Sequence, residues 1–471
     1  MIYDVAVVGT GFSAISLVTN LLLKLPSDAS IAIIGDDADF GRGTAYRTEL
    51  HLHRLNVPAA RMSAFTSRPS DFVEWLARKG RHLDGDGFAS RNDYGLYLRD
   101  TLASLLRAAH HRARVDFVKA KAINCAFQEE GIMMFRLSDG GDLRAVNVAL
   151  CLGVGTASLP RLTAVSDRAL LRRVVRNPWK LSWFGQVREN DTVAILGSGL
   201  TMIDQVLSLR NKGHRGKIHV LSRRGLAPHA HSSSPVVPVA PEADLSKLEI
   251  SQIVAALRAQ VRGGAEWRAV MDGLRPRTQA LWQGLNQTQR SRFLRHALAW
   301  WNIHRHRVAP QVHEAFDALV CDGTVTIHAG FVSQILREDE RNTLLFRHRG
   351  RPDEARLTFE WLINCTGMEH AGITHSPLLQ NMKTQSLLEA DDLGLGICVD
   401  DQSQLVCRDG TSREGLFALG ALTAGQFWEI TAVPDIRVQS DHCADTIARR
   451  VRARRKLSNI TDENAIRSGE I

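Results

Sequence analysis

The sequence predicts an α/β fold with two Rossmann-like units and a helical insertion. Three observations lead to this prediction. The chain has 471 residues, enough for about two or three domains with sizeable cores. Hydrophobic residues make up 44% of it and charged residues 23%, which is typical of a globular protein and not of a disordered one. A glycine-rich turn between an apolar strand and a helix occurs twice.

The first unit begins with a strand predicted over residues 3–9, whose uninterrupted apolar run is typical of a central parallel strand. The sequence GTGFSA follows at once. Gly9 permits a tight turn, Gly11 lets the backbone approach a pyrophosphate, and Ala14 stands where the third glycine packs the helix on the strand. This order predicts a dinucleotide-binding turn. The alternative is a glycine turn in another doubly wound fold.

The helix predicted after this turn ends before Pro26, and a second strand covers residues 31–34. Asp36 and Asp37 follow that strand, about 20 residues beyond Ala14, where a carboxylate accepts hydrogen bonds from ribose hydroxyls. Of the two carboxylates, we favour Asp36. An acidic strand end suits an unphosphorylated ribose, so the first unit is predicted to bind FAD.

The second unit begins near the middle of the chain, where an apolar strand of residues 193–196 leads into Gly197 and Gly199. Thr201 follows in the predicted first turn of a helix, and Met202 stands in place of the third glycine. Without that glycine the motif is weaker alone. The helical pattern that continues after it nevertheless predicts a second dinucleotide-binding turn.

The next strand, residues 218–221, ends in Ser222, Arg223 and Arg224. Units that bind NADP place a hydroxyl and arginines at this point, where they receive the 2′-phosphate. We therefore predict NADPH as the second cofactor, with NADH as the other candidate. The alternative is that the two arginines belong to a solvated loop. Two such cofactors in one chain imply electron transfer between them.

Composition argues against several other classes of protein. The seven cysteines are scattered and never spaced as CxxC, which argues against a zinc site and against a dithiol redox enzyme. No apolar run reaches the ~18 residues of a membrane helix, and a strand is predicted almost at Met1, so we expect no signal peptide, no membrane partner and a cytoplasmic location. The net charge of +9 suits anionic cofactors as well as nucleic acid, and we expect no nucleic-acid partner.

Several local motifs, one of them the second glycine turn with the start of its helix, carry a further resemblance. They are FGRGTAY (40–46), RLNVPAARMSAF (54–65), DFVEWL (71–76), GSGLTMID (197–204), LINCTG (362–367) and LFALGALTAGQFWEITAVPDIRVQ (416–439). Together they resemble the two-dinucleotide-binding-domain flavoproteins, and within them the bacterial FAD/NAD(P)-binding family related to N-hydroxylating and other flavin monooxygenases. The resemblance covers most of the chain.

The resemblance implies further cofactor contacts at Gly367 and Gly420, where the chain returns to the FAD domain. One departure is Ala421, which stands where the family has an aspartate directly after the glycine, so backbone amides replace that side-chain contact. The fingerprint of Baeyer–Villiger enzymes is missing, because Phe184 and Gly185 have the wrong spacing and no histidine follows. Ketone-to-ester chemistry is therefore disfavoured.

The two units and the resemblance imply a discontinuous FAD domain into which the NAD(P)H domain is inserted. The predicted segments are residues 1–180 and 360–457 for the FAD domain and 181–359 for the NAD(P)H domain, with a tail from 458 to 471. Within the NAD(P)H domain, a helical insertion is predicted over about 242–316. The basic run Arg449–Lys456 is predicted to be a solvated helix end rather than a nucleic-acid arm.

The insertion is rich in aromatic residues and follows a proline-rich segment, residues 232–241. Its tryptophans are predicted to pack in a core, and the alternative is a lid that faces the substrate. His304 and His306 are two residues apart, which places them on different faces of a helix, so no metal site is expected there. The tryptophans of this insertion are Trp267, Trp282, Trp300 and Trp301.

For activity, the resemblance implies a flavin hydroperoxide that adds one oxygen atom from O₂ to a small polar substrate. Urate hydroxylation to 5-hydroxyisourate is the leading specific prediction, and amino-acid N-hydroxylation is its rival. An NAD(P)H:acceptor reductase and a redox-sensing flavoprotein module are the alternatives without oxygenation. The residues predicted near the flavin are Asn56, Met62, Trp428, Glu429 and Thr431. His229 and His231 rank lower, as contacts to the nucleotide or the substrate.

Overall fold

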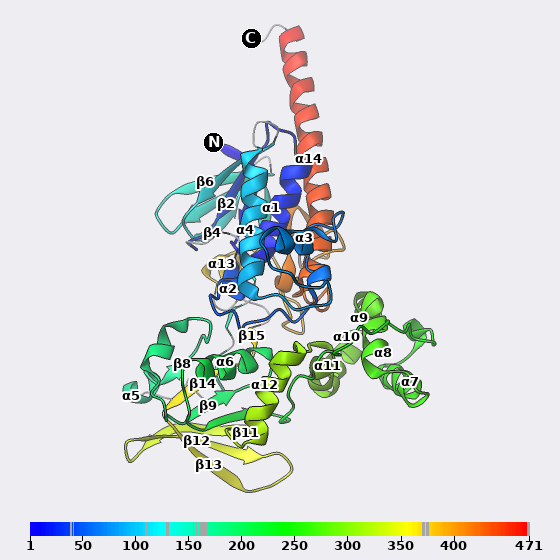
Figure 1. Cartoon of the computed structure of the whole chain (residues 1–471). Coiled ribbons are helices and arrows are strands. Elements are labelled where there is room, and N and C mark those ends of the chain that lie inside the picture. The colour runs from blue at the N-terminus through cyan, green and yellow to red at the C-terminus, as the bar shows by residue number, and fades with distance from the viewer. Residues whose placement is uncertain are drawn as a thin grey trace.

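The computed structural model describes residues 1–37, 40, 42–108, 112–128, 131–153, 155–156, 158–160, 167–369, 373 and 376–468, with the backbone alone at 156, 368–369 and 458–468. Two large sheets lie one above the other, joined by the crossing segments near residues 155 and 368 (Figure 1). These segments form a short antiparallel pair, β7 (Gly155–Thr156) with β15 (Met368–Glu369). The predicted fold class is confirmed.

The first sheet has the order β16-β17-β6-β1-β2-β3, with a β4–β5 hairpin that pairs with β6. Strands β1, β2, β3, β6 and β17 run parallel to their neighbours in this core of the sheet, and β16 is antiparallel at its edge. The strands are β1 (Ile2–Val8), β2 (Ser30–Ile34), β3 (Arg114–Val118), β4 (Ala122–Phe127), β5 (Met133–Leu137), β6 (Asp142–Leu150), β16 (Gln404–Val406) and β17 (Ser412–Ala418).

One face of this sheet is covered by two long helices, α1 (Phe12–Lys24) and α14 (Val433–Ser468). In α14 the apolar residues Cys443, Ala444, Ile447, Ala448 and Val451 recur at helical spacing, and all are buried against α1 and the strands. The helix continues beyond the sheet as far as Ser468 and so includes most of the segment for which the sequence predicts a tail (Figure 1).

The basic run near the end of α14 is not simply solvated. Arg455 forms ion pairs with Asp4 and Asp28, and Arg450 pairs with Glu414 at 3.2 Å. These arginines therefore link the helix to the first domain. Composition alone does not reveal the contacts, because Asp4 and Asp28 lie hundreds of residues earlier in the chain and Glu414 lies in β17.

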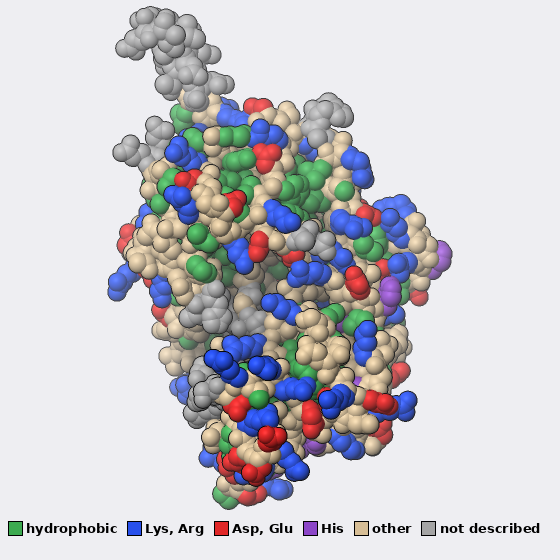
Figure 2. Space-filling model, turned by 90° about the vertical axis from the view of Figure 1, so that its left-hand side faces the viewer, with side chains coloured by type: hydrophobic (Ala, Val, Ile, Leu, Met, Phe, Trp, Pro, Cys, Tyr) green, Lys and Arg blue, Asp and Glu red, His purple; other side chains and the backbone are tan. Residues whose placement is uncertain are grey.

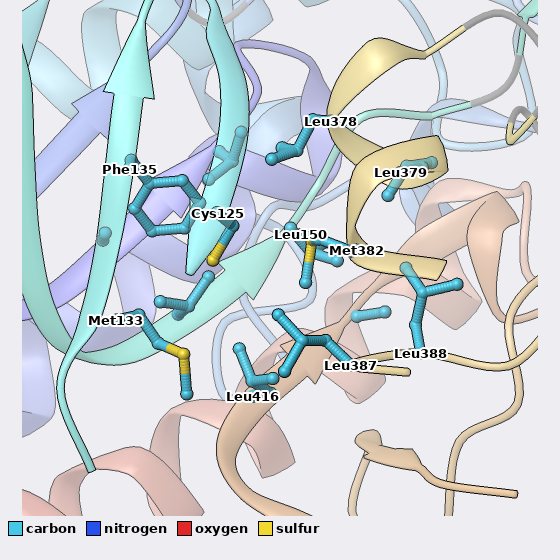
Figure 3. Close-up of a cluster of buried hydrophobic side chains, with 14 of the residues drawn as sticks. Cys125, Met133, Phe135, Leu150, Leu378, Leu379, Met382, Leu387, Leu388 and Leu416 are labelled. Carbon is cyan, nitrogen blue, oxygen red and sulfur yellow. The ribbon is translucent and has the colours of Figure 1, made fainter. Parts of the chain in front are cut away.

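The other face of the first sheet carries an apolar cluster that joins distant parts of the chain. Figure 3 shows Cys125, Met133 and Phe135 from the β4–β5 hairpin packed with residues of α13 (Pro377–Thr384) and the segment after it. Residues before 151 and after 376 thus share one core, as a discontinuous domain requires.

The second sheet has the order β13-β12-β11-β10-β9-β14-β8, in which β8 to β11 and β14 are parallel and the β11–β12–β13 meander is antiparallel. Helices α6 (Leu200–Asn211) and α12 (Pro310–Cys321) pack together beside it. The strands are β8 (Val174–Val175), β9 (Val193–Leu196), β10 (Ile218–Ser222), β11 (Val325–Glu338), β12 (Arg341–His348), β13 (Glu354–Phe359) and β14 (Trp361–Asn364).

The helical insertion lies to one side of the second sheet and reaches toward the first (Figure 1). It ends near Arg305 rather than at 316, because α12 carries Phe316 into the core of the second sheet and connects β10 to its parallel neighbour β11. Its helices are η6 (Leu245–Lys247), α7 (Ile250–Arg262), α8 (Trp267–Leu274), η7 (Arg275–Arg277), α9 (Thr278–Gly284), α10 (Gln287–Arg292), the π-helix η8 (Phe293–Ala297) and α11 (Leu298–Arg305).

The remaining helices are short or surround the end of the first sheet. They are α2 (Gly43–Tyr46), η1 (Ala59–Arg61), α3 (Asp71–Arg78), α4 (Arg91–Arg107), α5 (Arg168–Leu171), η5 (Leu181–Gln186) and η10 (Gly420–Leu422). Within the described residues, no helix combines the length and the apolar character needed to span a membrane.

Candidate dinucleotide-binding site

The first glycine of each turn lies where no other residue fits. Gly9 has φ of +127° and Gly197 has φ of +97°, both in the region that favours glycine. A Cβ on Gly9 would overlap the carbonyl oxygen of Cys151, and a Cβ on Gly197 would overlap that of Cys365. The two turns therefore approach the neighbouring strands β6 and β14 in the same way.

The second glycine of each turn faces open space instead. Gly11 and Gly199 are the N-caps of α1 and α6, with nearly equal extended conformations. Among the described residues, apart from the chain neighbours of each glycine, no heavy atom lies within 4 Å of a Cβ built on either of them. No side chain caps either helix. A helix N-terminus with free space in front of it favours a bound pyrophosphate, so both turns fit a dinucleotide.

The residues at the third glycine position of each motif do not border this open space. Ala14 and Met202 are both fully buried, Ala14 against the first sheet and Met202 against the second. Met202 therefore replaces the third glycine by filling the core below the helix. Thr201 lies half-buried in the first turn of α6, beside the opening.

Gly420 brings the last strand of the first sheet to the same turn. Its φ is +69°, and a Cβ on it would overlap the hydroxyl oxygen of Ser13 in the first turn of α1. Its amide donates to Oε1 of Gln439 at 2.8 Å. Gly367, with φ of +110°, faces open space after β14. The C-terminal part of the chain thus borders the first turn through backbone, in agreement with the missing aspartate at Ala421.

The strand ends carry opposite charges, as the sequence predicts. After β2, Asp37 pairs with Arg47 at 2.8 Å, and Asp36 pairs with Lys121 at 3.1 Å. The side chain of Asp36 is 56% exposed and that of Asp37 17%, so Asp37 is the more enclosed of the two carboxylates. The choice between them stays a prediction.

After β10, Ser222 connects the strand end to the glycine turn. The hydroxyl of Ser198 donates to Oγ of Ser222 at 2.8 Å. Arg224 donates to the carbonyl oxygen of His296 at 3.3 Å, whereas the guanidinium of Arg223 is exposed and has no partner among the described residues. Arg223 is therefore the cation available to a 2′-phosphate.

Arg349 adds a third guanidinium to this strand end, and the sequence analysis missed it. Its Nη1 donates to the carbonyl oxygen of Arg223 at 3.4 Å. It follows β12, more than a hundred residues later in the chain, and no local motif marks it. Figure 2 shows many Lys and Arg side chains on the lower half of one face, at the level of the second sheet, with Asp and Glu side chains among and below them.

Two of the residues predicted near the flavin lie in one apolar cluster. Met62 and Trp428 are 2% and 9% exposed and share this cluster with residues of α3 and α4. Asn56 uses its backbone, whose carbonyl oxygen accepts a hydrogen bond from Nε2 of His231 at 3.0 Å. Thr431 is exposed, and its amide donates to the carbonyl oxygen of Glu429.

Trp428 contacts the helical insertion. Its ring stacks on that of Trp282 with centroids 4.4 Å apart, and Phe293 meets it edge-on at 5.5 Å. The indole Nε1 of Trp282 also donates to the carbonyl oxygen of Gly425 at 2.8 Å. The predicted core role of Trp282 is confirmed by its 3% exposure, while Trp300 is 48% exposed and belongs to no core.

Glu429 is also engaged with the insertion. Its Oε1 accepts from Nε1 of Trp301 at 2.8 Å, and its Oε2 accepts from Nε of Arg305 at 3.0 Å. The side chain is 7% exposed, and its backbone φ is +63°. Both carboxylate oxygens thus accept hydrogen bonds from the insertion, which makes Glu429 a contact between domain and insertion, and its place near the flavin stays a prediction.

Further charges surround this contact. Arg275 pairs with Asp435 at 3.3 Å, and Nε2 of His306 lies 3.5 Å from Oε1 of Glu429. Burial lowers the pKa of Arg275 and of His306 and raises the pKa of Asp435. The groups therefore lie in a largely dehydrated region between the insertion and the first domain.

His229 and His231 lie at the base of the insertion. Ala230 between them forms a bridge with Val308, which closes the segment that contains the insertion. Burial lowers the pKa of His231 to about 4, so this ring is neutral at physiological pH. The ring of His229 contacts that of Trp267 at 5.3 Å. Both histidines therefore have contacts within the fold, and a contact of either with the nucleotide or the substrate stays a prediction. In the described part of the chain, no group of His, Cys, Asp and Glu side chains is arranged to hold a metal ion.

Comparisons with known proteins agree with this geometry. A family described as FAD-NAD(P)-binding matches residues 6–155. Among solved structures, the ornithine N-hydroxylase of Kutzneria sp. 744 matches with a TM-score of 0.68 at 15% identity, over 96% of this chain and all of that one. The L-lysine 6-monooxygenase of Pseudomonas syringae matches with a TM-score of 0.64 at 16% identity, over 95% and 99%.

A third match is the bacillithiol disulfide reductase of Bacillus cereus, with a TM-score of 0.55 at 14% identity, over 96% of this chain and 100% of that one. No curated protein matches the sequence. At such identities the structural matches show a shared fold, and the matched fold spans nearly the whole chain.

Proposed function

We propose that this chain, which has the fold of two-dinucleotide-binding-domain flavoproteins, is an FAD-dependent, NADPH-using monooxygenase that N-hydroxylates a primary amine of a small substrate. FAD binds at Gly9 and Gly11, and NADPH binds at Gly197 and Gly199. The observation that carries the proposal is the pair of open helix N-termini with opposite charges at their strand ends. When bound, the cofactors supply hydride transfer and the activation of O₂.

The chain's own residues hold the nucleotides and exclude water. The helix N-termini receive the pyrophosphates, and Arg223 neutralises the 2′-phosphate. The stack of Trp282 on Trp428 and the sealed Glu429 contact close the insertion over the end of the first domain. Such closure protects a reactive oxygen species from water.

Primary amines are favoured over urate as substrates. Two of the matched proteins, the ornithine N-hydroxylase and the L-lysine 6-monooxygenase, act on amino acids with a terminal amine, and each is matched over almost its whole length. This supports the amino-acid N-hydroxylase that the sequence analysis gave as the rival prediction. Urate remains a comparison substrate in the test.

A reductase without oxygenation is the second candidate, because the bacillithiol disulfide reductase shares the fold. The cysteines give this candidate no support. None is spaced as CxxC, and Cys125, Cys151, Cys365 and Cys443 are buried, with burial raising the pKa of each thiol. Four of the seven thiols are therefore poorly placed to react with a disulfide substrate.

The test measures NADPH and O₂ consumption by the FAD-loaded protein with ornithine, lysine and urate. A monooxygenase consumes one amine, one O₂, one NADPH and one proton to give the hydroxylamine, water and NADP⁺. We expect one of the amino acids to accelerate NADPH oxidation and to gain one oxygen atom by mass spectrometry. Lysine acetylated on its side-chain nitrogen is the control and should be inert. Reduction of a disulfide or a quinone, with no oxygenated product, would establish the reductase instead.

A further inference from the structure

Two buried polar contacts join α6 to the first domain, and the proposed function uses neither. They involve Arg91 and His53 on the first domain and Asp204 and Ser208 on α6. We infer that they form a joint that fixes the orientation of the NADPH-binding helix relative to the FAD-binding domain, and that Asp204 and Arg91 are positioning residues for flavin reduction. The inference rests on the proposed binding of both cofactors but not on hydroxylation.

The first contact is an ion pair. Nη2 of Arg91 lies 3.0 Å from Oδ2 of Asp204, and the two side chains are 14% and 8% exposed. The arginine is held from its own side as well, because its Nε donates to the carbonyl oxygen of Arg54 at 3.2 Å and its amide donates to that of His53 at 2.8 Å. Breaking a buried pair of this kind leaves a charge without a partner, which is strongly unfavourable.

The second contact is a chain of hydrogen bonds through His53, which is completely buried. Its Nε2 is 2.7 Å from Oγ of Ser208, and its Nδ1 is 2.7 Å from Oγ1 of Thr48. The Ser208 hydroxyl donates to the carbonyl oxygen of Asp204 at 2.7 Å, so it accepts from Nε2 of His53. Nδ1 then accepts from Thr48. One proton assignment satisfies every group, and burial lowers the pKa of His53, which keeps the ring neutral.

The segment that connects the two domains meets this joint. The ring of Trp179 lies edge-on to that of His53 with centroids 5.9 Å apart. The guanidinium of Arg91 lies 5.3 Å from the centre of the Trp179 ring. Trp179 belongs to the sequence NPWK, where the chain passes from the first domain toward the second sheet. First domain, connection and α6 therefore meet at one point.

The position of this joint on α6 explains its consequence. The helix begins at Leu200, directly after Gly199, and Asp204 lies one turn farther along, about 6 Å from that end. A helix is rigid over this length, so the contacts on its side fix the direction of its N-terminus. A rotation of the second domain would break the ion pair and the hydrogen bonds together. The joint thus holds the NADPH site in one orientation toward the FAD domain.

The main experiment compares Asp204→Asn and Ser208→Ala with Asp142→Asn, which breaks the half-exposed pair of Arg136 and Asp142 within the first sheet. Flavin reduction is followed by rapid mixing with NADPH without oxygen. A misplaced donor slows such a step roughly 10- to 100-fold, and we expect a loss in that range for Asp204→Asn at saturating NADPH. FAD content and the Kd for NADPH should change less than about twofold, because the pyrophosphate site itself is intact.

Two further measurements separate positioning from general damage. Arg91→Lys keeps the charge pair and should retain most of the reduction rate. Hydrogen exchange of the cofactor-free protein should rise in α6 and in residues 177–180 of Asp204→Asn, and not in Asp142→Asn. If Asp204→Asn does not fold, Ser208→Ala carries the same comparison with a smaller expected loss.

Unchanged reduction at saturating NADPH, with or without faster exchange, would overturn the inference. A loss confined to the Kd for NADPH would overturn it too, because Asp204 would then belong to the binding site. Normal flavin reduction in the parent protein without hydroxylation of any amine would contradict the proposed function and leave the joint intact.

Discussion

At the scale of single residues, the two glycines of each turn have different tasks. Gly9 and Gly197 are required by the fold, because their conformations and their closeness to a neighbouring carbonyl exclude any side chain. Gly11 and Gly199 are required by the ligand, because the space in front of them is open in the protein alone. This difference between positions two residues apart leads to a direct test.

We expect Gly11→Val to fold normally and to lose FAD, since its side chain would occupy the space of the pyrophosphate. Gly9→Ala should instead destabilise the protein by about 1 to 3 kcal/mol, through strain at positive φ and overlap with Cys151. Thermal unfolding and the flavin absorbance of the purified variants check both results. Gly199→Val is the matched control and should keep FAD while weakening NADPH binding. Full FAD content in folded Gly11→Val would contradict the assignment of the first unit.

The glycines were predictable because their signal is local, within a few residues of a strand and a helix. Glu429 was not. Its partners Trp301 and Arg305 lie more than 120 residues earlier in the chain, and only the tertiary structure shows that they occupy its carboxylate. The pair of Arg91 and Asp204 could not be predicted for the same reason, because its two residues lie 113 residues apart in the chain.

At the scale of elements, the end of β10 is where we expect the preference between NADPH and NADH to be set. The sequence treats Arg223 and Arg224 alike, whereas the structure separates them. Arg224 is engaged with the insertion through His296, and Arg223 is exposed. The contribution of Arg349 depends on the turn after β12, which meets β10 only in the folded sheet.

Arg223→Ala should therefore raise the KM for NADPH more than Arg224→Ala does. A charge-assisted hydrogen bond to the 2′-phosphate is worth about 1.5 to 3 kcal/mol, so the expected increase is roughly tenfold or more. The KM for NADH should stay within about twofold, because that nucleotide lacks the phosphate. Steady-state oxidation of both nucleotides measures the difference. If NADH is already the better donor in the parent protein, these arginines belong to a solvated loop.

The strands at the two glycine turns, predicted over residues 3–9, 31–34, 193–196 and 218–221, follow from apolar runs, since buried parallel strands lack polar interruptions. Most other strands of the two sheets were not predicted. The limits of the insertion do not follow from any such local pattern. Helix α12 has the same helical periodicity as its predecessors, and only its packing on α6 assigns it to the second sheet. The length of α14 beyond Val451, the last buried residue among the side chains that the structure describes, was also not predicted.

At the scale of the whole molecule, several hydrophobic cores join distant parts of the chain, and two of them bear on its domain organisation. One joins the β4–β5 hairpin to α13 and makes the discontinuous first domain a single unit. The other joins α3 and α4 to the loop before α14 and to the helical insertion. The resemblance to a known family made the first arrangement predictable. For the second, the sequence did not decide whether the insertion packs in a core or forms a lid, because its contact with the first domain depends on how the two parts meet in the folded chain.

Trp282 tests whether the insertion is held in place. Its side chain lies on α9 and is 3% exposed. Its ring stacks on Trp428, and its indole nitrogen donates to the carbonyl oxygen of Gly425, so both contacts join α9 to the first domain. Trp282→Ala removes these contacts together, and large-to-small changes of this kind cost about 3 to 5 kcal/mol. We expect a clear fall in Tm, faster proteolysis within the helical insertion, and more hydrogen peroxide per NADPH consumed, because water gains access to the closed site.

Trp300→Ala is the matched control for this prediction. Its side chain is 48% exposed in the same insertion, so its removal should change stability by less than about 0.5 kcal/mol. Equal behaviour of the two variants would mean that the insertion does not depend on the Trp282 contact and moves as a lid. A loss of stability and of product coupling confined to Trp282→Ala would instead mean that the insertion is fixed on the first domain, since the same residue would then be needed for folding and for protection from water. In that case substrates must reach the site without movement of the insertion.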